Sequence, residues 1–300
     1  MSSDALETWS EVDPPAQIVL KHARDAFVDQ SSIEAQWRDL NFAAPPNLTR
    51  AVDEYDTFAD ILRQCGAALT FLPRTQEVGL DSIYVRDASV STPRGMVMCR
   101  MGKSQRAGEP AAQRRAFDAA GIPVLGSIVA PGTLEGGDVV WLDSSTVIVG
   151  HGYRSNADGI RQFQNLLGDR TQVTVVPLPH WRGPGDVFHL MSMLSPVDHD
   201  LAVVYSRLLP VPFRGWLLDR GVQLIDVPDE EFDSMGANVL AIRARVCVMA
   251  DGNPRTRRLL EAHGAQVSVY DGSEISVKGG GGPTCLSRPM GRRTPGVPTA

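Results

Sequence analysis

The sequence predicts an α/β fold in which five similar units form a pseudo-symmetric propeller around a central axis. A helical pattern that ends at a glycine and leads into an apolar strand occurs five times in the 300 residues. The five glycines are Gly66, Gly121, Gly168, Gly221 and Gly264. Their separations of 55, 47, 53 and 43 residues are similar enough to indicate a structural repeat. Corresponding positions of such repeats meet near the axis, so we expect an axial active site.

The first unit shows the pattern. Leu48–Cys65 places apolar side chains at helical spacing, and Gly66 follows the helix end. The apolar run Ala67–Leu72 predicts a strand, which Pro73 ends. The other helix and strand pairs are expected at Pro110–Ala120 and Ile122–Val129, Asn156–Leu167 and Val173–Leu178, Val211–Arg220 and Val222–Val227, and Pro254–His263 and Ala265–Tyr270. Further strands are predicted at Ile83–Val85, Gly95–Cys99, Val139–Leu142, Thr146–Gly150, Val187–Leu194, Leu201–Tyr205, Val239–Ile242, Val246–Met249 and Ile275–Val277.

The two ends of the chain are expected to lie outside the propeller. Residues 1–40 are interpreted as a loose polar arm followed by a weakly amphipathic helix at Ala16–Gln30, and residues 291–300 as a flexible tail. A single catalytic domain then spans 41–290, although the length alone also allows two domains. Its first stretch, Asn41–Asn47, is too rich in proline for a helix and is a candidate cover for the site.

The composition excludes several classes of protein. The net charge of −6 and the lack of a Lys/Arg run argue against nucleic acid as a partner. No window of 18 apolar residues predicts a membrane span, and the polar first residues do not resemble a signal peptide, so we expect a cytoplasmic protein. The four cysteines show no C-x-x-C spacing, and we expect neither a metal nor an organic cofactor. The oligomeric state is open, and a homodimer is compatible with the sequence.

One glycine-rich segment has the composition expected of a loop that positions a thiol. Ile275–Ser287 runs from a short apolar stretch through four glycines and a proline to Cys285. Glycines allow the backbone to approach other groups closely, and the proline stiffens the approach to the cysteine. Taken alone, the segment is equally compatible with a flexible loop beside an ordinary buried cysteine.

Residues with catalytic potential recur at similar offsets from the repeat glycines. Asp87, His189 and Cys285 each lie 21 residues after the glycine of their unit. In the other two units Glu135 follows at 14 residues and Asn238 at 17, where we expect Asn238 to serve the turn rather than the chemistry. The propeller would therefore bring an acid, a histidine and a cysteine together at the axis.

A cysteine and a histidine at one site predict nucleophilic catalysis, with the thiolate attacking and the imidazole moving protons. Nearby carboxylates raise the pKa of a thiol and make it a poorer nucleophile at rest. Such carboxylates are useful if the substrate is a cation. The carboxylates bind the substrate, and the positive charge of the substrate then helps to ionise the thiol. A guanidinium fits best, since it is planar, always charged and matches carboxylates in a bidentate manner.

Six motifs occur in an order that is similar to a known superfamily. They are D-S-I-Y-V-R-D (Asp81–Asp87), R-x-G-E-P (Arg106–Pro110), L-E-G-G-D (Leu134–Asp138), G-Y-R-S-N (Gly152–Asn156), F-H-L (Phe188–Leu190) and G-G-G-P-T-C-L-S (Gly280–Ser287). Together they resemble the guanidine-modifying superfamily with the pentein fold, and most of all the dimethylarginine dimethylaminohydrolases. The resemblance extends from about Asn41 to Cys285.

The resemblance implies a role for three catalytic residues. Cys285 would attack the guanidinium carbon. His189 would protonate the departing amine and then activate the water that hydrolyses the thiouronium intermediate. Glu135 would be the acid beside the histidine and the guanidinium.

The resemblance also implies four substrate-binding residues for a small cationic guanidino substrate. Asp87 would hold the guanidinium nitrogens, with Asp81 as a supporting acid. Arg106 and Arg154 would clamp the α-carboxylate of the substrate.

The family leaves the exact reaction open. We expect a hydrolase that converts an Nω-methylated arginine to citrulline and methylamine or dimethylamine; the alternatives are an arginine deiminase, an amidinotransferase, or a propeller that binds ligands without catalysis. Arginine deiminases and glycine amidinotransferases resemble one another in carrying an aspartate two residues after the histidine, where this chain has Met191. If Phe188–Leu190 lies in a strand, Met191 points the same way as His189 and offers an apolar wall to a methyl group.

Overall fold

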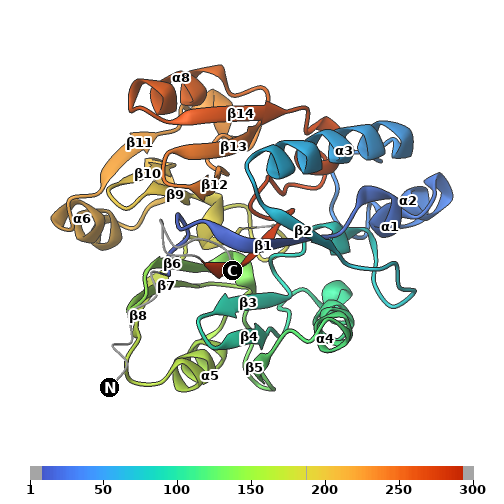
Figure 1. Ribbon diagram of the computed structural model, residues 1–300, viewed down its shortest axis with the longest axis horizontal. Helices are drawn as coiled ribbons and strands as arrows, with labels where there is room; N and C mark the ends of the chain where they lie inside the picture. Colours follow the sequence, from blue (N-terminus) through green and yellow to red (C-terminus); the bar gives the residue numbers. More distant parts are fainter. Residues whose placement is uncertain (1–8, 187, 293–300) are drawn as a thin grey trace.

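The computed structural model describes residues 9–186 and 188–292, and it arranges them as five small sheets in a ring (Figure 1). Each sheet has three strands. The middle strand runs antiparallel to one neighbour and parallel to the other in every sheet. This repeated arrangement confirms the expected five-unit α/β propeller.

The strands follow the chain around the ring, except that the first sheet contains both early and late strands. The sheets comprise β1 (Pro15–Leu20), β2 (Ala68–Phe71) and β15 (Arg288–Arg292); β3 (Ser89–Thr92), β4 (Gly95–Met98) and β5 (Val124–Ser127); β6 (Val139–Asp143), β7 (Thr146–His151) and β8 (Gln172–Pro177); β9 (Leu194–Asp198), β10 (Leu201–Val204) and β11 (Gln223–Asp226); and β12 (Leu240–Arg243), β13 (Val246–Ala250) and β14 (Gln266–Tyr270).

One longer helix joins the two parallel strands of each sheet and lies on the outside of the ring (Figure 1). These helices are α3 (Leu48–Gln64), α4 (Glu109–Ala119), α5 (Ala157–Leu167), α6 (Val211–Asp219) and α8 (Pro254–Ala262). The shorter helices are α1 (Ala23–Phe27), α2 (Gln30–Gln36) and α7 (Asp229–Phe232). The five repeat glycines have φ angles between 67° and 84°, a left-handed backbone that glycine adopts without strain. The predicted helix ends are thus confirmed.

The first sheet closes the ring and corrects the expected role of residues 1–40. The expected helix at Ala16–Gln30 is wrong: β1 begins at Pro15, and the short helix α1 follows it. β1 pairs with β2 on one side and with β15 on the other, so the start of the described chain belongs to the propeller. Ile18, Val19 and Leu20 are fully buried between these neighbours. Residues 291 and 292 end β15, and 293–300 lie outside the described residues.

Three expected strands form turns instead. Leu80–Ile83 and Leu190–Ser192 are 3₁₀ turns where strands were expected at Ile83–Val85 and Val187–Leu194; Val187 itself lies outside the described residues. Ser273–Val277 is a π-helical turn that replaces the strand expected at Ile275–Val277. Short apolar runs are buried equally well in a strand or in a turn against the core, so periodicity alone could not distinguish them.

The apolar core lies between the sheets and their outer helices. On α3, for example, Tyr55, Phe58 and Leu62 are fully buried and pack in one cluster with Ile18 and Leu20 of β1. Within the described residues, no helix combines the length and the apolar character needed to cross a membrane.

Candidate active site

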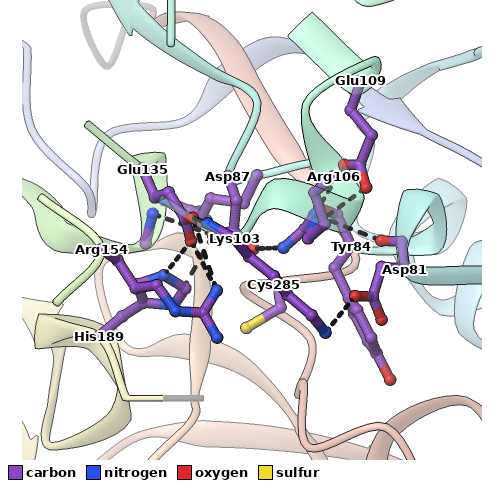
Figure 2. A network of polar contacts seen from close by, with 12 residues as sticks. Asp81, Tyr84, Asp87, Lys103, Arg106, Glu109, Glu135, Arg154, His189 and Cys285 are labelled. Carbon is purple, nitrogen blue, oxygen red and sulfur yellow. Dashed lines mark hydrogen bonds and ion pairs between the residues drawn. The ribbon is translucent and has the colours of Figure 1, made fainter. Parts of the chain in front are cut away.

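The residues expected at the axis lie just before the strand that pairs antiparallel with the middle strand of each sheet. Asp87 precedes β3, Glu135 precedes β6, His189 precedes β9, Asn238 precedes β12 and Cys285 precedes β15. These turns point toward the centre of the ring, where Figure 2 shows four of the five side chains together. His189 contacts both Glu135 and Asp87, Asn238 contacts Cys285, and Asp87, His189 and Cys285 line one cavity, so the structure brings the repeats together as predicted.

The imidazole of His189 lies between two carboxylates. Its Nε2 is 2.7 Å from Glu135 Oε2, and its Nδ1 is 3.9 Å from Asp87 Oδ1. Burial by itself lowers the pKa of His189, but the charges of Asp87, Asp138 and Glu135 outweigh it and raise the pKa to about 9. The ring is therefore protonated at neutral pH and can donate a proton to a leaving group.

Glu135 is fixed as a carboxylate. Its Oε1 accepts hydrogen bonds from the backbone N–H groups of Gly102 at 2.9 Å and Lys103 at 3.1 Å, and Arg154 Nη1 lies 3.2 Å from Oε2. Burial alone would raise the pKa of Glu135, but the hydrogen bond and charge of His189, together with Arg154, hold it well below its usual range. The side chain thus remains an acceptor at any pH near neutrality.

Asp87 is supported by Arg106 rather than left free. Arg106 Nη1 donates to Asp87 Oδ2 at 2.5 Å, and its Nε and Nη2 each donate to Glu109 at 2.8 Å. Nη2 also donates to the Tyr84 carbonyl at 2.9 Å, and the residue is only 4% exposed. This corrects the expected carboxylate clamp: the guanidinium nitrogens of Arg106 are already occupied, so its geometry is that of an internal support for Asp87.

Arg154 also lies differently from the expected clamp. Its guanidinium lies against Glu135, and its Nη2 donates to the Asp186 carbonyl at 3.4 Å. It shares the wall of a narrow cavity with Cys285 and is almost fully buried. In this conformation Arg154 pairs with Glu135 rather than facing open space.

Sequence reasoning missed Lys103. Its ammonium lies 2.6 Å from Asp81 Oδ2 and donates to the Leu40 carbonyl at 2.8 Å. Asp81, expected to support the substrate guanidinium, is thereby already paired with a side chain of its own protein. The lysine lies three residues before Arg106, so only its closeness to a motif arginine could have drawn attention to it.

The thiol of Cys285 is partly exposed and is held by its neighbours. Asn238 Oδ1 accepts from the backbone N–H and the hydroxyl of Thr284, at 3.0 and 2.9 Å. Asn238 Nδ2 lies 3.5 Å from Cys285 Sγ. Burial, and then the charge of Asp87, raise the pKa of the thiol, so it is protonated at rest. Asn238 therefore serves the turn, as expected, and also contacts the thiol of Cys285.

The glycine run explains how the backbone reaches this place. A Cβ at Gly282 would collide with the Asn238 side chain, and one at Gly281 with the ring of Tyr84. Gly280 adopts a φ of 75°. The segment needs glycine because its backbone passes directly against side chains of two other units.

Two cavities meet at the thiol. The larger, of about 430 Å³, is lined by residues that include Cys285, His189, Met191, Trp181 and Phe232. Asn41 and Ala43 from the expected cover also line it. The smaller, of about 20 Å³, lies among the charged residues Asp81, Asp87, Lys103, Arg106 and Arg154. The larger cavity gives the thiol access to a ligand, while arginine and lysine side chains fill most of the space around the smaller one.

Three of these side chains are close enough to share a metal ion. One ligand atom from each of Asp87, Glu135 and His189 lies within 4.8 Å of the others. Both carboxylates are already paired with arginines, and the imidazole is protonated near neutrality. A cation would have to displace these partners, so we still expect the cluster to act without a metal.

Comparisons with known proteins identify the family. A family model described as N,N dimethylarginine dimethylhydrolase, eukaryotic, matches residues 26–291. The N(G),N(G)-dimethylarginine dimethylaminohydrolase of Pseudomonas aeruginosa is 29% identical over 81% of this chain and 89% of its own length. The protein of the same name from Streptomyces coelicolor is 30% identical over 79% of this chain and 84% of its own.

A solved structure shows the same fold. A mutant of the Pseudomonas aeruginosa enzyme complexed with citrulline superposes with a TM-score of 0.75 at 24% identity, covering 91% of this chain and 98% of the other. The family model spans most of the chain, and the fold agrees over nearly all of it. The chain belongs to the dimethylarginine dimethylaminohydrolase family.

Proposed function

We propose that this chain hydrolyses a guanidinium C–N bond through a covalent adduct on Cys285, with an Nω-methylated arginine derivative as substrate and citrulline and methylamine or dimethylamine as products. One observation supports this most strongly: a protonated histidine, bonded to a carboxylate, shares the wall of the larger cavity with a cysteine. Family membership supports the class of reaction.

The first half-reaction forms the adduct. Asp87 and Glu135 accept hydrogen bonds from the guanidinium N–H groups, and the positive charge of the guanidinium lowers the pKa of the thiol, which releases its proton to solvent. The thiolate of Cys285 then bonds to the guanidinium carbon. As the C–N bond breaks, the imidazolium of His189 donates its proton to the amine, which leaves as a neutral molecule. A thiouronium remains on the cysteine.

The second half-reaction releases the product. The neutral His189 removes a proton from water, and the water oxygen bonds to the same carbon. The C–S bond breaks, leaving a urea group on the product and a thiolate on Cys285. The proton taken from water has already restored the imidazolium, and the hydroxyl proton of the product group returns to the thiolate, so the enzyme returns to its starting state.

The methyl preference rests on Met191. Its buried side chain lines the larger cavity with His189, which gives a methylated nitrogen an apolar neighbour. Leu190–Ser192 forms a 3₁₀ turn where a strand was expected, and Met191 still lines the same cavity as His189. Burying one methyl group contributes about 0.8 kcal/mol, whereas an unpaired N–H costs about 1–3 kcal/mol.

A product screen tests the proposal. The protein is incubated with arginine, its Nω-methyl derivatives, agmatine and guanidino acids, and products are identified by mass spectrometry. Brief reaction followed by acid quench should show a mass increase confined to the peptide containing Cys285. Release of ammonia from arginine in preference to a methylamine would replace the proposal with a deiminase. Hydrolysis without any adduct would refute the covalent step.

A further inference from the structure

We infer that Lys103 selects the substrate by holding Asp81, the one acid among the described residues of the small cavity wall that is not paired with an arginine, so that the physiological substrate is a guanidino carboxylate without a free ammonium group. An N-acylated or desamino relative of arginine has this chemistry. The inference rests on the proposed function, because it concerns the tail of the same substrate. It keeps the guanidinium chemistry and replaces free citrulline, as the product, by its N-acylated or desamino counterpart.

The contacts of Lys103 are those that any bound ammonium requires. Its Nζ lies 2.6 Å from the carboxylate of Asp81 and 2.8 Å from the carbonyl of Leu40. The side chains of Lys103 and Asp81 are only 8% and 6% exposed, so water does not replace these partners readily. A substrate ammonium cannot use Asp81 unless it first displaces another ammonium of equal charge.

The charges around the small cavity favour an anionic tail. Its wall includes the acids Asp81 and Asp87 and the bases Lys103, Arg106, Arg154 and protonated His189. Glu135 pairs with Arg154 and His189 behind this wall, so these four cations face these three carboxylates. Figure 2 shows the Arg154 guanidinium and the Lys103 ammonium on either side of the Cys285 thiol. A carboxylate near these two cations is attracted, whereas an ammonium beside it is repelled.

Replacing Lys103 with methionine should reverse this selection. Methionine keeps a similar length and fills the same apolar path, but it leaves the carboxylate of Asp81 and the carbonyl of Leu40 without a cation. These two acceptors would then form a receptor for a substrate ammonium. The backbone N–H of Lys103, which supports Glu135, is unchanged by the substitution.

The experiment compares three substrates that share a dimethylguanidinium group: dimethylarginine, its α-N-acetyl derivative and its desamino analogue. For the wild type, kcat/KM should be at least about 10-fold higher for the two compounds without an ammonium, the size of a buried charge-assisted contact. Lys103→Met should lower this ratio by a similar factor or invert it. Lys21→Met is the matched control, because Lys21 is also a buried lysine whose ammonium donates to a carbonyl, that of Pro73, but it lines neither cavity at the thiol. It should leave the ratio unchanged.

Binding separates this inference from the proposed function. Calorimetric titration of the Cys285→Ser variant with arginine, α-N-acetylarginine and desaminoarginine needs no turnover and no change at Lys103. Tighter binding of the last two supports the inference even if another reaction occurs at the site. Tighter binding of arginine overturns it, and would indicate that a different acid, such as Asp186 on the wall of the larger cavity, receives the ammonium. Equal losses for all three substrates in Lys103→Met would also overturn it.

Discussion

Asn238→Asp should make the thiol of Cys285 harder to ionise without disturbing the turn that carries it. The side chain of Asn238 has two separate tasks: Oδ1 anchors Thr284, and Nδ2 lies 3.5 Å from Cys285 Sγ. Aspartate has the same shape and keeps the anchoring oxygen. It replaces the amide beside the sulfur with a second carboxylate oxygen.

The size of the effect follows from the 3.5 Å distance. Two unit negative charges at that separation repel by roughly 5 kcal/mol at an effective dielectric constant of about 20. One pKa unit corresponds to about 1.4 kcal/mol, so the pKa of the thiol should rise by up to roughly 3 units. Burial and Asp87 already raise this pKa, and the substitution adds a second nearby carboxylate. Turnover at neutral pH should fall by about 100-fold or more.

The assay is the pH dependence of alkylation by iodoacetamide, followed for each cysteine peptide by mass spectrometry. Cys65 is also partly exposed and provides an internal control within the same sample, whereas Cys99 and Cys247 are buried. The midpoint for Cys285 should shift upward in Asn238→Asp, while that of Cys65 stays in place.

Asn238→Ala provides the second comparison. It removes both the anchor of Thr284 and the amide near the thiol, so its melting temperature should fall, while that of Asn238→Asp should stay close to the wild type. An unchanged alkylation midpoint for Cys285 in a folded Asp variant would show that this side chain does not control the thiol. The reasoning from the 3.5 Å contact would then be refuted.

Three further changes test other parts of the site. His189 has a pKa of about 9 against an ordinary value near 6.5, so the unfolding free energy should be highest below pH 6.5 and decrease by up to about 3 kcal/mol as the pH rises through 9; denaturant titrations should show this slope in the wild type and a flatter one in His189→Gln. Cys285→Ser should abolish turnover with little change in melting temperature, and activity in this variant would show that Cys285 is not the nucleophile. Met191→Asp should shift the kcat/KM ratio from methylated arginine derivatives toward unmethylated ones by about 10-fold or more, and an unchanged ratio would remove Met191 from the specificity pocket.

Local signals made the fold predictable. A glycine that ends a helix needs only its own left-handed backbone, so the pattern could be recognised five times without knowledge of distant contacts. The recurring offset then placed Asp87, His189 and Cys285 in equivalent positions. Each precedes the strand that pairs antiparallel with the middle strand of its sheet, where a turn can direct the side chain toward the axis. The repeat in the sequence was therefore enough to place these three residues together without knowledge of the strand pairing.

Long-range pairing was not predictable in the same way. β1 is a strand because β2 and β15 provide neighbours on both sides, and β15 begins at residue 288. Apolar side chains at Ile18, Val19 and Leu20 suit a buried strand as well as one face of a short helix. The choice depends on a partner more than 260 residues away, which no local pattern contains.

The partners of the arginine and lysine side chains in the site were not predicted from the sequence. Part of this pairing follows from the cost of burying a charge. Motif positions suggested that Arg106 and Arg154 face the substrate, but each pairs with a buried acid. A carboxylate loses several kcal/mol when it is buried without a counter-charge. A deep site with acids at Asp81, Asp87 and Glu135 must therefore obtain cations from its own chain whenever substrate is absent. The basic residues nearest the motifs are the natural source. Only the structure shows which acid each one reaches, because a flexible side chain such as that of Lys103 can extend to any of several neighbours.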